Sequence, residues 1–247
     1  MSVKELAVLL YGRQVGVVEE TKGGQHVFTY ADDPGNTPVS LSMPLGLRQH
    51  KNRVVQPYLD GLLPDREETR LALGREFGVS GRNPFALLSH IGLDCAGAVQ
   101  FVVAGRVSEA LARPGHLVDV SVEQIGARIT ALNSGAQESW VSPTERWSLA
   151  GSQAKFALHR RLDGTWAQSL GATPTTHIIK PGIDGLRDQA LNEHVCLTAA
   201  TRLGLAASTS EFAEFGGQPA IVVERYDRIR RPDGELLRVH QEDLCQA

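Results

Sequence analysis

A run of small residues in the second half of the chain has the composition of an anion-binding loop. Ser148-Leu149-Ala150-Gly151-Ser152-Gln153-Ala154-Lys155 leads directly into an apolar segment. Small side chains allow backbone N–H groups to approach an anionic ligand closely, as phosphate-binding loops do. A tight loop without a ligand has the same composition. On its own, the run is therefore compatible with either interpretation.

A lysine at the end of an apolar strand gives the loop a possible partner. Lys180 ends the β-branched run 175–180, and the helical pattern that follows carries Glu193, thirteen residues later. A strand lysine paired with a helix glutamate positions nucleotide phosphates in kinase N-lobes. A lysine at such a position can also be a rim residue with its stem packed on apolar surface. The spacing nevertheless predicts that Glu193 is the partner of Lys180.

The third candidate element is Glu224-Arg225-Tyr226, which follows the apolar strand 220–223. In a kinase lobe, a hinge at this place offers backbone groups to adenine. Loop, lysine strand, helix, strand and hinge thus follow one another in kinase order. Such an order is harder to obtain by chance than any single motif.

Composition narrows the classes of function. The chain has 247 residues and a formal net charge of −3, from 25 Lys+Arg against 28 Asp+Glu. A protein whose main surface binds nucleic acid is usually basic, so this charge argues against that class of function. Three scattered cysteines give no disulfide framework and indicate a reducing compartment. With no signal-peptide pattern or 18-residue apolar run, we expect a cytoplasmic chain without membrane contact.

Other kinds of site have little support. The motifs GxxxxGK[ST], GxGxxG, HExxH and GxSxG do not occur. The eight histidines show no i, i+4 pairing, which argues against a metal site and leaves a metal-dependent hydrolase as a weak third reading. Cys95 lies among small and apolar residues, so we expect a buried hydrophobe rather than a nucleophile.

The elements that must position these residues fall into two groups. The first half predicts an antiparallel meander followed by helices. Its strands are expected at 6–10, 15–18, 26–30, 39–43 and 98–104, and its helices at 55–63, from Pro64-Asp65 to Phe77, and at 84–91 behind an Asn83 cap. Residues 106–119 are the best candidate linker, and Ser121 with Gln124 forms a capping box for the next helix.

The second half predicts a sheet with one long helix. Strands are expected around an Asp163-Gly164 turn, at 175–180, 211–215, 220–226 and 236–239. The helix is expected at 191–203, with Cys196, Ala199, Ala200 and Leu203 on one face. The fold class is therefore α+β: an N-terminal β-meander and helical subdomain (1–104), a connector with a helix (105–135) and a kinase N-lobe-like antiparallel sheet (136–247).

Several motifs in collinear order resemble those of HipA-type serine/threonine kinases, the toxin halves of bacterial toxin–antitoxin modules. They are SLSMPL (40–45), DGLLP (60–64) followed by Arg70, IGLDCAGAV (91–99), SLAGSQAKFAL (148–158), PTTHIIKP (174–181), Asn192-Glu193, VERYDR (223–228) and HQEDLCQA (240–247). The resemblance implies that ATP binds at Ala150, Gly151, Ser152, Gln153, Ala154, Lys155, Lys180, Glu224, Arg225 and Tyr226. It also implies that Ser148 is autophosphorylated, which silences the enzyme.

The family implies partners and cofactors as well. These are ATP and Mg²⁺, a protein substrate of the aminoacyl-tRNA synthetase class, and a small HipB-like helix-turn-helix antitoxin that connects the toxin to DNA. Kinases of this type use an Asp as base and a second Asp with an Asn for Mg²⁺. No HRDxxxxN-like or DFG-like segment occurs in these residues. We therefore assign no catalytic or metal-binding residue, expect the base beyond Ala247, and expect this chain alone to be inactive. The alternative is a non-catalytic module that binds an antitoxin or a nucleotide.

Overall fold

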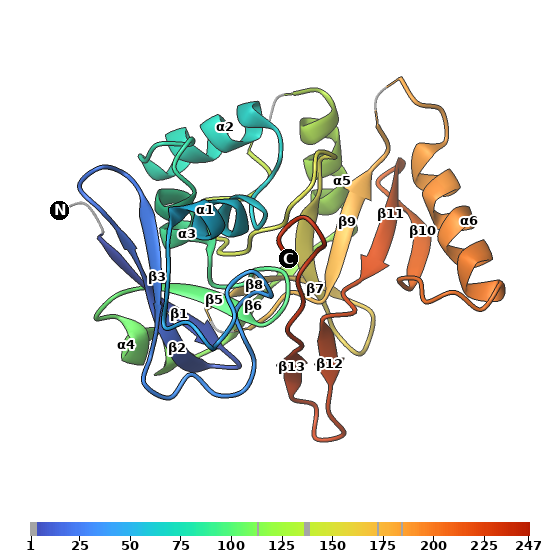
Figure 1. Cartoon of the computed structure of the whole chain (residues 1–247). Coiled ribbons are helices and arrows are strands. Elements are labelled where there is room, and N and C mark those ends of the chain that lie inside the picture. The colour runs from blue at the N-terminus through green and yellow to red at the C-terminus, as the bar shows by residue number, and fades with distance from the viewer. Residues whose placement is uncertain (1–3, 113, 136–138, 172, 184) are drawn as a thin grey trace.

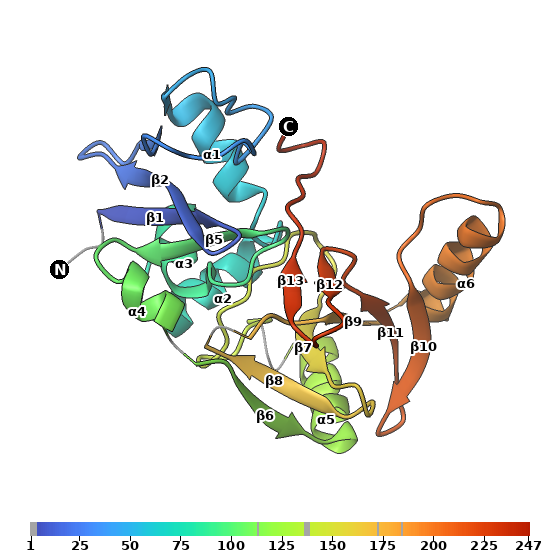
Figure 2. The ribbon, with the colours of Figure 1, turned by 90° about the horizontal axis from the view of Figure 1, so that it is seen from below.

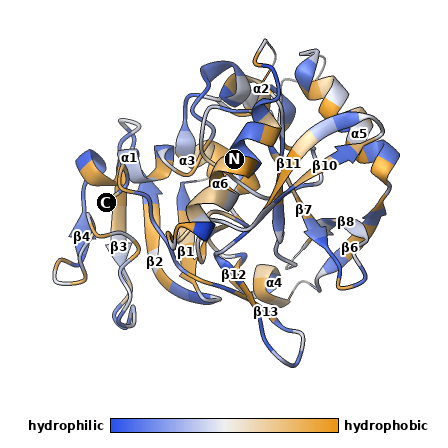
Figure 3. Cartoon of the chain, turned by 90° about the vertical axis from the view of Figure 1, so that its right-hand side faces the viewer, coloured by the Kyte–Doolittle hydropathy of each residue, from blue (hydrophilic) through white to orange (hydrophobic). Residues whose placement is uncertain are grey.

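The N-terminal part of the chain forms a five-stranded antiparallel sheet in the order β4-β3-β2-β1-β5. The computed structural model describes residues 4–112, 114–135, 139–171, 173–183 and 185–247. The strands are β1 (Glu5–Leu10), β2 (Arg13–Glu20), β3 (His26–Tyr30), β4 (Gln49–His50) and β5 (Val99–Val103). β1 is mostly apolar, whereas β2 is apolar only in its middle, at Val15, Val17 and Val18; apolar residues are orange in Figure 3.

Helices cover both faces of this sheet (Figure 1). On one side lie α1 (Asn52–Asp60), α2 (Glu67–Phe77) and α3 (Pro84–Ile91), and on the other the short α4 (Val107–Ala112). Successive side chains of a strand point to opposite faces. Leu6 and Val8 accordingly lie in the main core, whereas Ala7 and Leu9 form a small second cluster towards α4.

The second sheet has six antiparallel strands in the order β10-β11-β9-β7-β8-β6. They are β6 (His116–Val120), β7 (Phe156–Arg160), β8 (Trp166–Leu170), β9 (His177–Pro181), β10 (Ser210–Phe215) and β11 (Gln218–Glu224). Helices α5 (Val122–Asn133) and α6 (Gln189–Arg202) pack on opposite faces. Ala220 and Val222 belong to the main core with α5, whereas Ile221 and Val223 cluster with α6.

The end of the chain returns to the N-terminal unit. The hairpin β12 (Arg228–Arg230) and β13 (Leu236–Arg238) projects from the molecule (Figure 1), and the following segment runs back towards α1 (Figure 2). There His240 Nε2 lies 3.1 Å from the Val39 carbonyl, and Gln246 Nε2 donates to the Tyr58 carbonyl at 3.2 Å. The Leu41 N–H also donates to Glu242 Oε2 at 2.9 Å, so the motifs at 40–45 and 240–247 are in contact.

The α+β class with antiparallel sheets is confirmed, as are most local signals. Asn83 caps α3 through a bond from the Ala86 N–H to its side chain, and Pro84 is the first residue of that helix. Ser121 and Gln124 form both bonds of the capping box. Gly78 ends α2 with a left-handed φ of +67°.

Four local predictions are wrong. Residues 39–43 hold only an isolated Ser40–Met43 bridge, and the fourth strand is β4. α2 begins at Glu67 rather than beside Pro64-Asp65, because Asp65 bonds to Gly151 instead. The proposed linker contains α4 and β6, whose pairing partner β8 lies far along the chain. Finally, α6 packs through Ala190 and Leu197, while Cys196 and Leu203 are exposed. Arg113 and residues 136–138, at the predicted boundaries, lie outside the described residues.

Candidate functional site

The predicted lysine and glutamate meet between β9 and α6. Lys180 Nζ donates to Glu193 Oε1 at 2.7 Å, and about a quarter of each side chain is exposed. The second oxygen of Glu193 accepts a bond from Gln189 Nε2 at 3.2 Å. Gln189 Oε1 in turn accepts one from Gln153 Nε2 at 3.2 Å. The small-residue loop is thus connected to the ion pair through side chains.

Lys155, at the end of that loop, forms a second cationic group beside Lys180. Its Nζ donates to the Ala150 carbonyl at 2.7 Å and lies 4.8 Å from the centre of the Trp140 ring. Burial, with a smaller contribution from Lys180, lowers the pKa of Lys155 to about 8. Two ammonium groups held near a loop of small residues form a site that favours an anion.

The loop itself is closed onto the N-terminal unit. Gly151 has a φ of +102°, a conformation that residues with a side chain rarely adopt, so the turn of the loop favours glycine at this position. The Gly151 N–H donates to Asp65 Oδ1 at 3.3 Å, and the Asp65 N–H donates to the Gly151 carbonyl at 3.1 Å. The Asp65 carboxylate therefore already accepts a hydrogen bond from one N–H group of the loop. Ser152 and Ala154 complete the loop.

Ser148 is completely buried in this conformation. Its hydroxyl donates to the Leu62 carbonyl at 2.6 Å, and its N–H donates to the Asp94 carbonyl at 3.1 Å. Both partners belong to the N-terminal unit. A phosphoryl donor therefore reaches this hydroxyl only if the segment leaves its place.

The predicted hinge residues divide between two faces. Glu224 and Tyr226 are exposed, whereas the intervening Arg225 points inward and is 3% exposed. The N–H groups of Glu224 and Arg225 donate to the carbonyls of Thr209 and Thr176. The Tyr226 hydroxyl contacts the side chain of Gln241. The structure thus does not bring the Arg225 side chain to the lysine pair.

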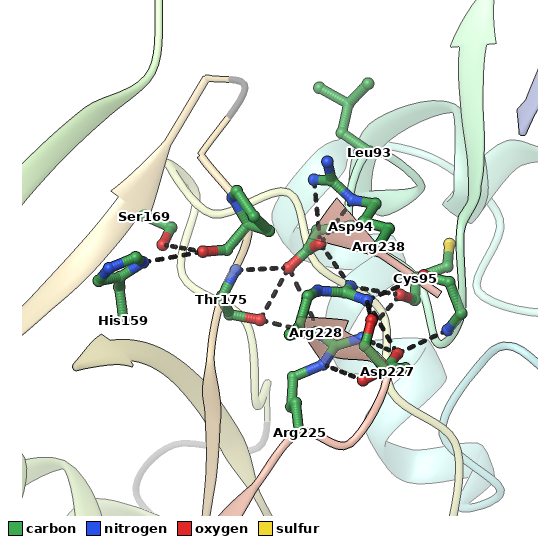
Figure 4. Close-up of polar contacts among 12 residues, drawn as sticks. Leu93, Asp94, Cys95, His159, Ser169, Thr175, Arg225, Asp227, Arg228 and Arg238 are labelled. Atoms are coloured by element: carbon green, nitrogen blue, oxygen red, sulfur yellow. Dashed lines mark hydrogen bonds and ion pairs between the residues drawn. The ribbon is translucent and has the colours of Figure 1, made fainter. Parts of the chain in front are cut away.

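Arg225 instead belongs to a buried ionic cluster that sequence reasoning did not find (Figure 4). We use the name ionic cluster for Asp94, Thr175, Arg225, Asp227, Arg228 and Arg238. Asp94 Oδ1 accepts from Arg228 at 2.8 Å and from Arg238 at 3.1 Å, and its Oδ2 accepts from the Thr175 N–H at 2.9 Å and hydroxyl at 2.7 Å. The only sequence signal for the ionic cluster is the presence of charged residues in the otherwise apolar or turn-like motifs at 91–99 and 223–228.

Charge compensation keeps the ionic cluster ionised. Burial opposes ionisation of Asp94, but the three arginines outweigh it and hold the pKa of its carboxyl well below the ordinary value. Asp227 is bonded to Arg225 at 2.7 Å and 3.0 Å, and its pKa is also lowered despite burial. The neighbouring Cys95 is buried, and burial raises the pKa of its thiol to about 12, so it stays protonated.

Family models match both halves of this chain. A model described as HipA N-terminal domain matches residues 6–102, and one described as HipA-like C-terminal domain matches residues 147–247. The chain belongs to the HipA family. Asp94 lies in the first matched region, and Ser148, Lys180 and the 224–226 segment lie in the second.

Two relatives of this HipA-family chain carry kinase names. A putative kinase, Y4mE, of Sinorhizobium fredii is 36% identical over an alignment of 259 residues, which covers 100% of this chain and 60% of the relative. The serine/threonine-protein kinase toxin HipA of Shewanella oneidensis is 32% identical over 211 residues, covering 85% of this chain and 46% of the relative. The chain thus spans roughly half the length of these relatives.

A solved structure has the same fold. The complex of the Shewanella oneidensis toxin–antitoxin system, HipA with HipB and operator DNA, matches with a TM-score of 0.77 and 29% identity. The match covers 98% of this chain and 55% of the other.

The described residues present a cationic site but no obvious metal site. Lys155, Lys180 and the glycine-containing loop fit the phosphates of a nucleotide. Among the residues that the structure describes, no group of three or more His, Cys, Asp or Glu side chains is placed to hold a metal ion. In the same part of the chain, no helix has the length and apolar character needed to cross a membrane.

Proposed function

We propose that this HipA-family chain forms the nucleotide-binding half of a serine/threonine protein kinase toxin. The observation that supports it most directly is the Lys180–Glu193 ion pair beside the loop 150–155. In kinases a lysine held by a helix glutamate places the nucleotide phosphates. The kinase names of two relatives support the same class of activity.

In this proposal, different residues bind the phosphates and the base of the nucleotide. Lys180 and Lys155 bind the phosphates, together with N–H groups of the loop residues Ala150 to Ala154. Glu224 and Tyr226 lie along the base, whereas the Arg225 N–H donates to the Thr176 carbonyl and is not available to it. Because Gly151 is bonded to Asp65, the N–H of Gly151 becomes available only when that contact opens.

Phosphoryl transfer needs groups that these residues do not supply. A kinase requires an Asp base and an Asp and Asn that hold Mg²⁺, and no HRDxxxxN-like or DFG-like segment occurs here. We therefore propose that the 247 residues bind ATP without turning it over on their own. The γ-phosphoryl group of the whole enzyme would go to a serine of a protein substrate, of the aminoacyl-tRNA synthetase class by family resemblance.

The proposed partner is a HipB-like antitoxin. The structural neighbour is a complex of HipA, HipB and operator DNA. The net charge of −3 gives this chain little attraction for DNA of its own, so DNA contact would pass through the antitoxin.

Phosphorylation of Ser148 would act on the loop. The hydroxyl is buried against the Leu62 carbonyl, which leaves no room for a phosphate with a charge of about −1.5 to −2. A phosphorylated Ser148 would therefore force the segment out and remove the loop from the nucleotide site.

Calorimetric titration of ATP tests the proposal. We expect the wild-type chain to bind ATP, Lys180→Met to bind at least about tenfold more weakly, and the exposed-loop control Lys22→Met to bind as wild type does. No ATP binding by the wild type would reject the proposal. If a HipB-like antitoxin still bound, the result would favour the alternative, a non-catalytic antitoxin-binding module. ATP turnover with Mg²⁺ by this chain alone would contradict the claim that it is catalytically incomplete.

A further inference from the structure

The ionic cluster joins the two halves of the chain at the predicted base-binding segment. Asp94 follows α3 in the N-terminal unit, whereas Arg225 and Arg228 flank Tyr226 in the C-terminal unit. All three side chains are at most 8% exposed. Buried charges with this many partners fix geometry strongly, because a shift of one group leaves others without a partner.

The ionic cluster determines which way the segment faces. The Arg225 guanidinium donates to the Cys95 carbonyl at 2.8 Å, and the Asp227 carboxylate accepts from the Gly97 N–H at 2.7 Å. Residues on either side of Tyr226 are thus anchored in the N-terminal unit. Tyr226 lies in the turn that the Arg228 N–H closes by donating to the Arg225 carbonyl at 3.1 Å, and it is 67% exposed while the side chains of Arg225 and Asp227 point inward.

Asp94 also contacts the segment that leads into the loop, but through its main chain. Its carbonyl accepts from the Ser148 N–H at 3.1 Å, and its N–H donates to the Arg146 carbonyl at 3.1 Å. The main chain of Asp94 therefore holds the start of the phosphate loop, and its carboxylate holds the base-binding segment. The two functions are separable, because a change of side chain leaves the main-chain bonds available.

We propose that Asp94 is a positioning residue of the nucleotide site, whose carboxylate fixes the 224–226 segment at the distance and orientation that the base requires. The inference rests on the proposed function and adds that the N-terminal unit determines how well the base is recognised. Asp94 itself need not touch the nucleotide. Arg225, which the sequence suggested as an ATP-binding residue, then acts through Asp94 and Thr175.

Asp94→Asn separates positioning from general destabilisation when two ligands are compared. ATP has a base and phosphates, whereas inorganic tripolyphosphate has phosphates alone and uses only the loop and the lysines. We expect Asp94→Asn to weaken ATP binding about tenfold or more and to leave tripolyphosphate binding within about twofold. A structural role alone would reduce both in the same proportion, as the folded fraction falls.

A second variant keeps the test available if Asp94→Asn does not fold. Thr175→Val has a similar shape and no charge change, yet removes the hydroxyl that donates to Asp94 at 2.7 Å and accepts from Arg225 at 2.9 Å. It should show the same selective loss for ATP, more weakly. The control is Glu211→Gln, which breaks the partly exposed Arg160–Glu211 pair and should change neither affinity.

The outcomes distinguish this inference from the proposed function. Wild-type chain that binds neither ligand overturns both. Wild-type binding of ATP together with unchanged or equally reduced binding of the two ligands in folded Asp94→Asn or Thr175→Val overturns only the positioning role. Selective loss of ATP binding supports it. Circular dichroism of each variant at the titration temperature establishes that the chain is folded.

Discussion

Lys180 and Glu193 form an ion pair of 2.7 Å that connects strand β9 to helix α6. Elsewhere α6 packs on the sheet through Ala190 and Leu197, and His194 Nδ1 lies 3.0 Å from the Ser210 hydroxyl of β10. In the proposed function, a lysine amine fixed in this way would bind a phosphate without first losing side-chain freedom.

Glu193→Gln tests whether the carboxylate prepares Lys180 for the nucleotide. We expect ATP affinity to fall about five- to tenfold, because Lys180 loses its charged partner and samples more rotamers. The free energy of unfolding should change by less than about 1 kcal/mol, because the pair is partly exposed to solvent. Calorimetric titration and urea unfolding measure the two effects. Large destabilisation with unchanged affinity would contradict this view and assign the pair a structural role.

The burial of Lys155 predicts a pH dependence of stability. Its pKa is about 8 in the folded chain against an ordinary value of 10.5. Between these values the unfolded chain holds a proton that the folded chain has lost, so the contribution of Lys155 to the free energy of unfolding rises with pH across that window. The full effect is about 3 kcal/mol.

Comparison with Lys155→Met isolates this contribution. Urea unfolding between pH 7.5 and 10.5 should give a rise in the wild type that the variant lacks. Curves that remain parallel over the window would show that Lys155 titrates normally. Because phosphate binding requires the charged amine, ATP affinity of the wild type should also decrease above about pH 8.

The lysine pairing could be predicted from the sequence because it depends on local periods. A strand that ends at Lys180 and a helix that begins soon afterwards limit the carboxylates within reach, and Glu193 is one turn into that helix. The same reasoning predicted the caps at Asn83 and Ser121. These features involve residues that are close in the chain.

The ionic cluster could not be predicted in this way. Asp94 and its partners Arg225 and Arg228 are 131 and 134 residues apart, and only the packing of the two units brings them together. Considered one at a time in the sequence, Asp94 is an acidic residue between a helix and a strand, and Arg225 is a residue of the predicted hinge. Neither gives a sign of the other. The packing face of α6 was predicted wrongly for another reason. Apolar residues lie all around this helix, so the sequence does not single out one face. Only the position of Ile221 and Val223 in β11 shows which face is packed.

The buried Arg128–Glu145 pair predicts a large effect from a small substitution. Glu145 is fully buried and accepts from Arg128 at 2.8 and 2.9 Å and from the Ser142 N–H at 2.8 Å. Glu145→Gln leaves Arg128 with an uncompensated charge and should reduce the free energy of unfolding by about 3–5 kcal/mol. Because Arg128 also donates to the Trp140 carbonyl, the ring beneath Lys155 should become less ordered.

The partly exposed Arg160–Glu211 pair is the matched control for this substitution. Its side chains are 33% and 45% exposed, so Glu211→Gln should cost less than about 1 kcal/mol. Urea unfolding of both variants gives the comparison. Equal losses would mean that the burial of Glu145 does not determine the cost.

At Gly126, the ordinary preference of a helix for alanine over glycine should be reversed. It lies inside α5, where alanine is usually more stable than glycine by about 1 kcal/mol. A Cβ at this position would lie 2.3 Å from the Phe215 carbonyl oxygen and 2.9 Å from its carbonyl carbon, which are backbone atoms at the end of β10. Gly126→Ala should therefore push α5 away from the sheet and reduce the free energy of unfolding by about 1–3 kcal/mol. The neighbouring exposed Ala127→Gly should lose about 1 kcal/mol from propensity alone, and a Gly126→Ala variant more stable than wild type would show that α5 does not pack closely against β10.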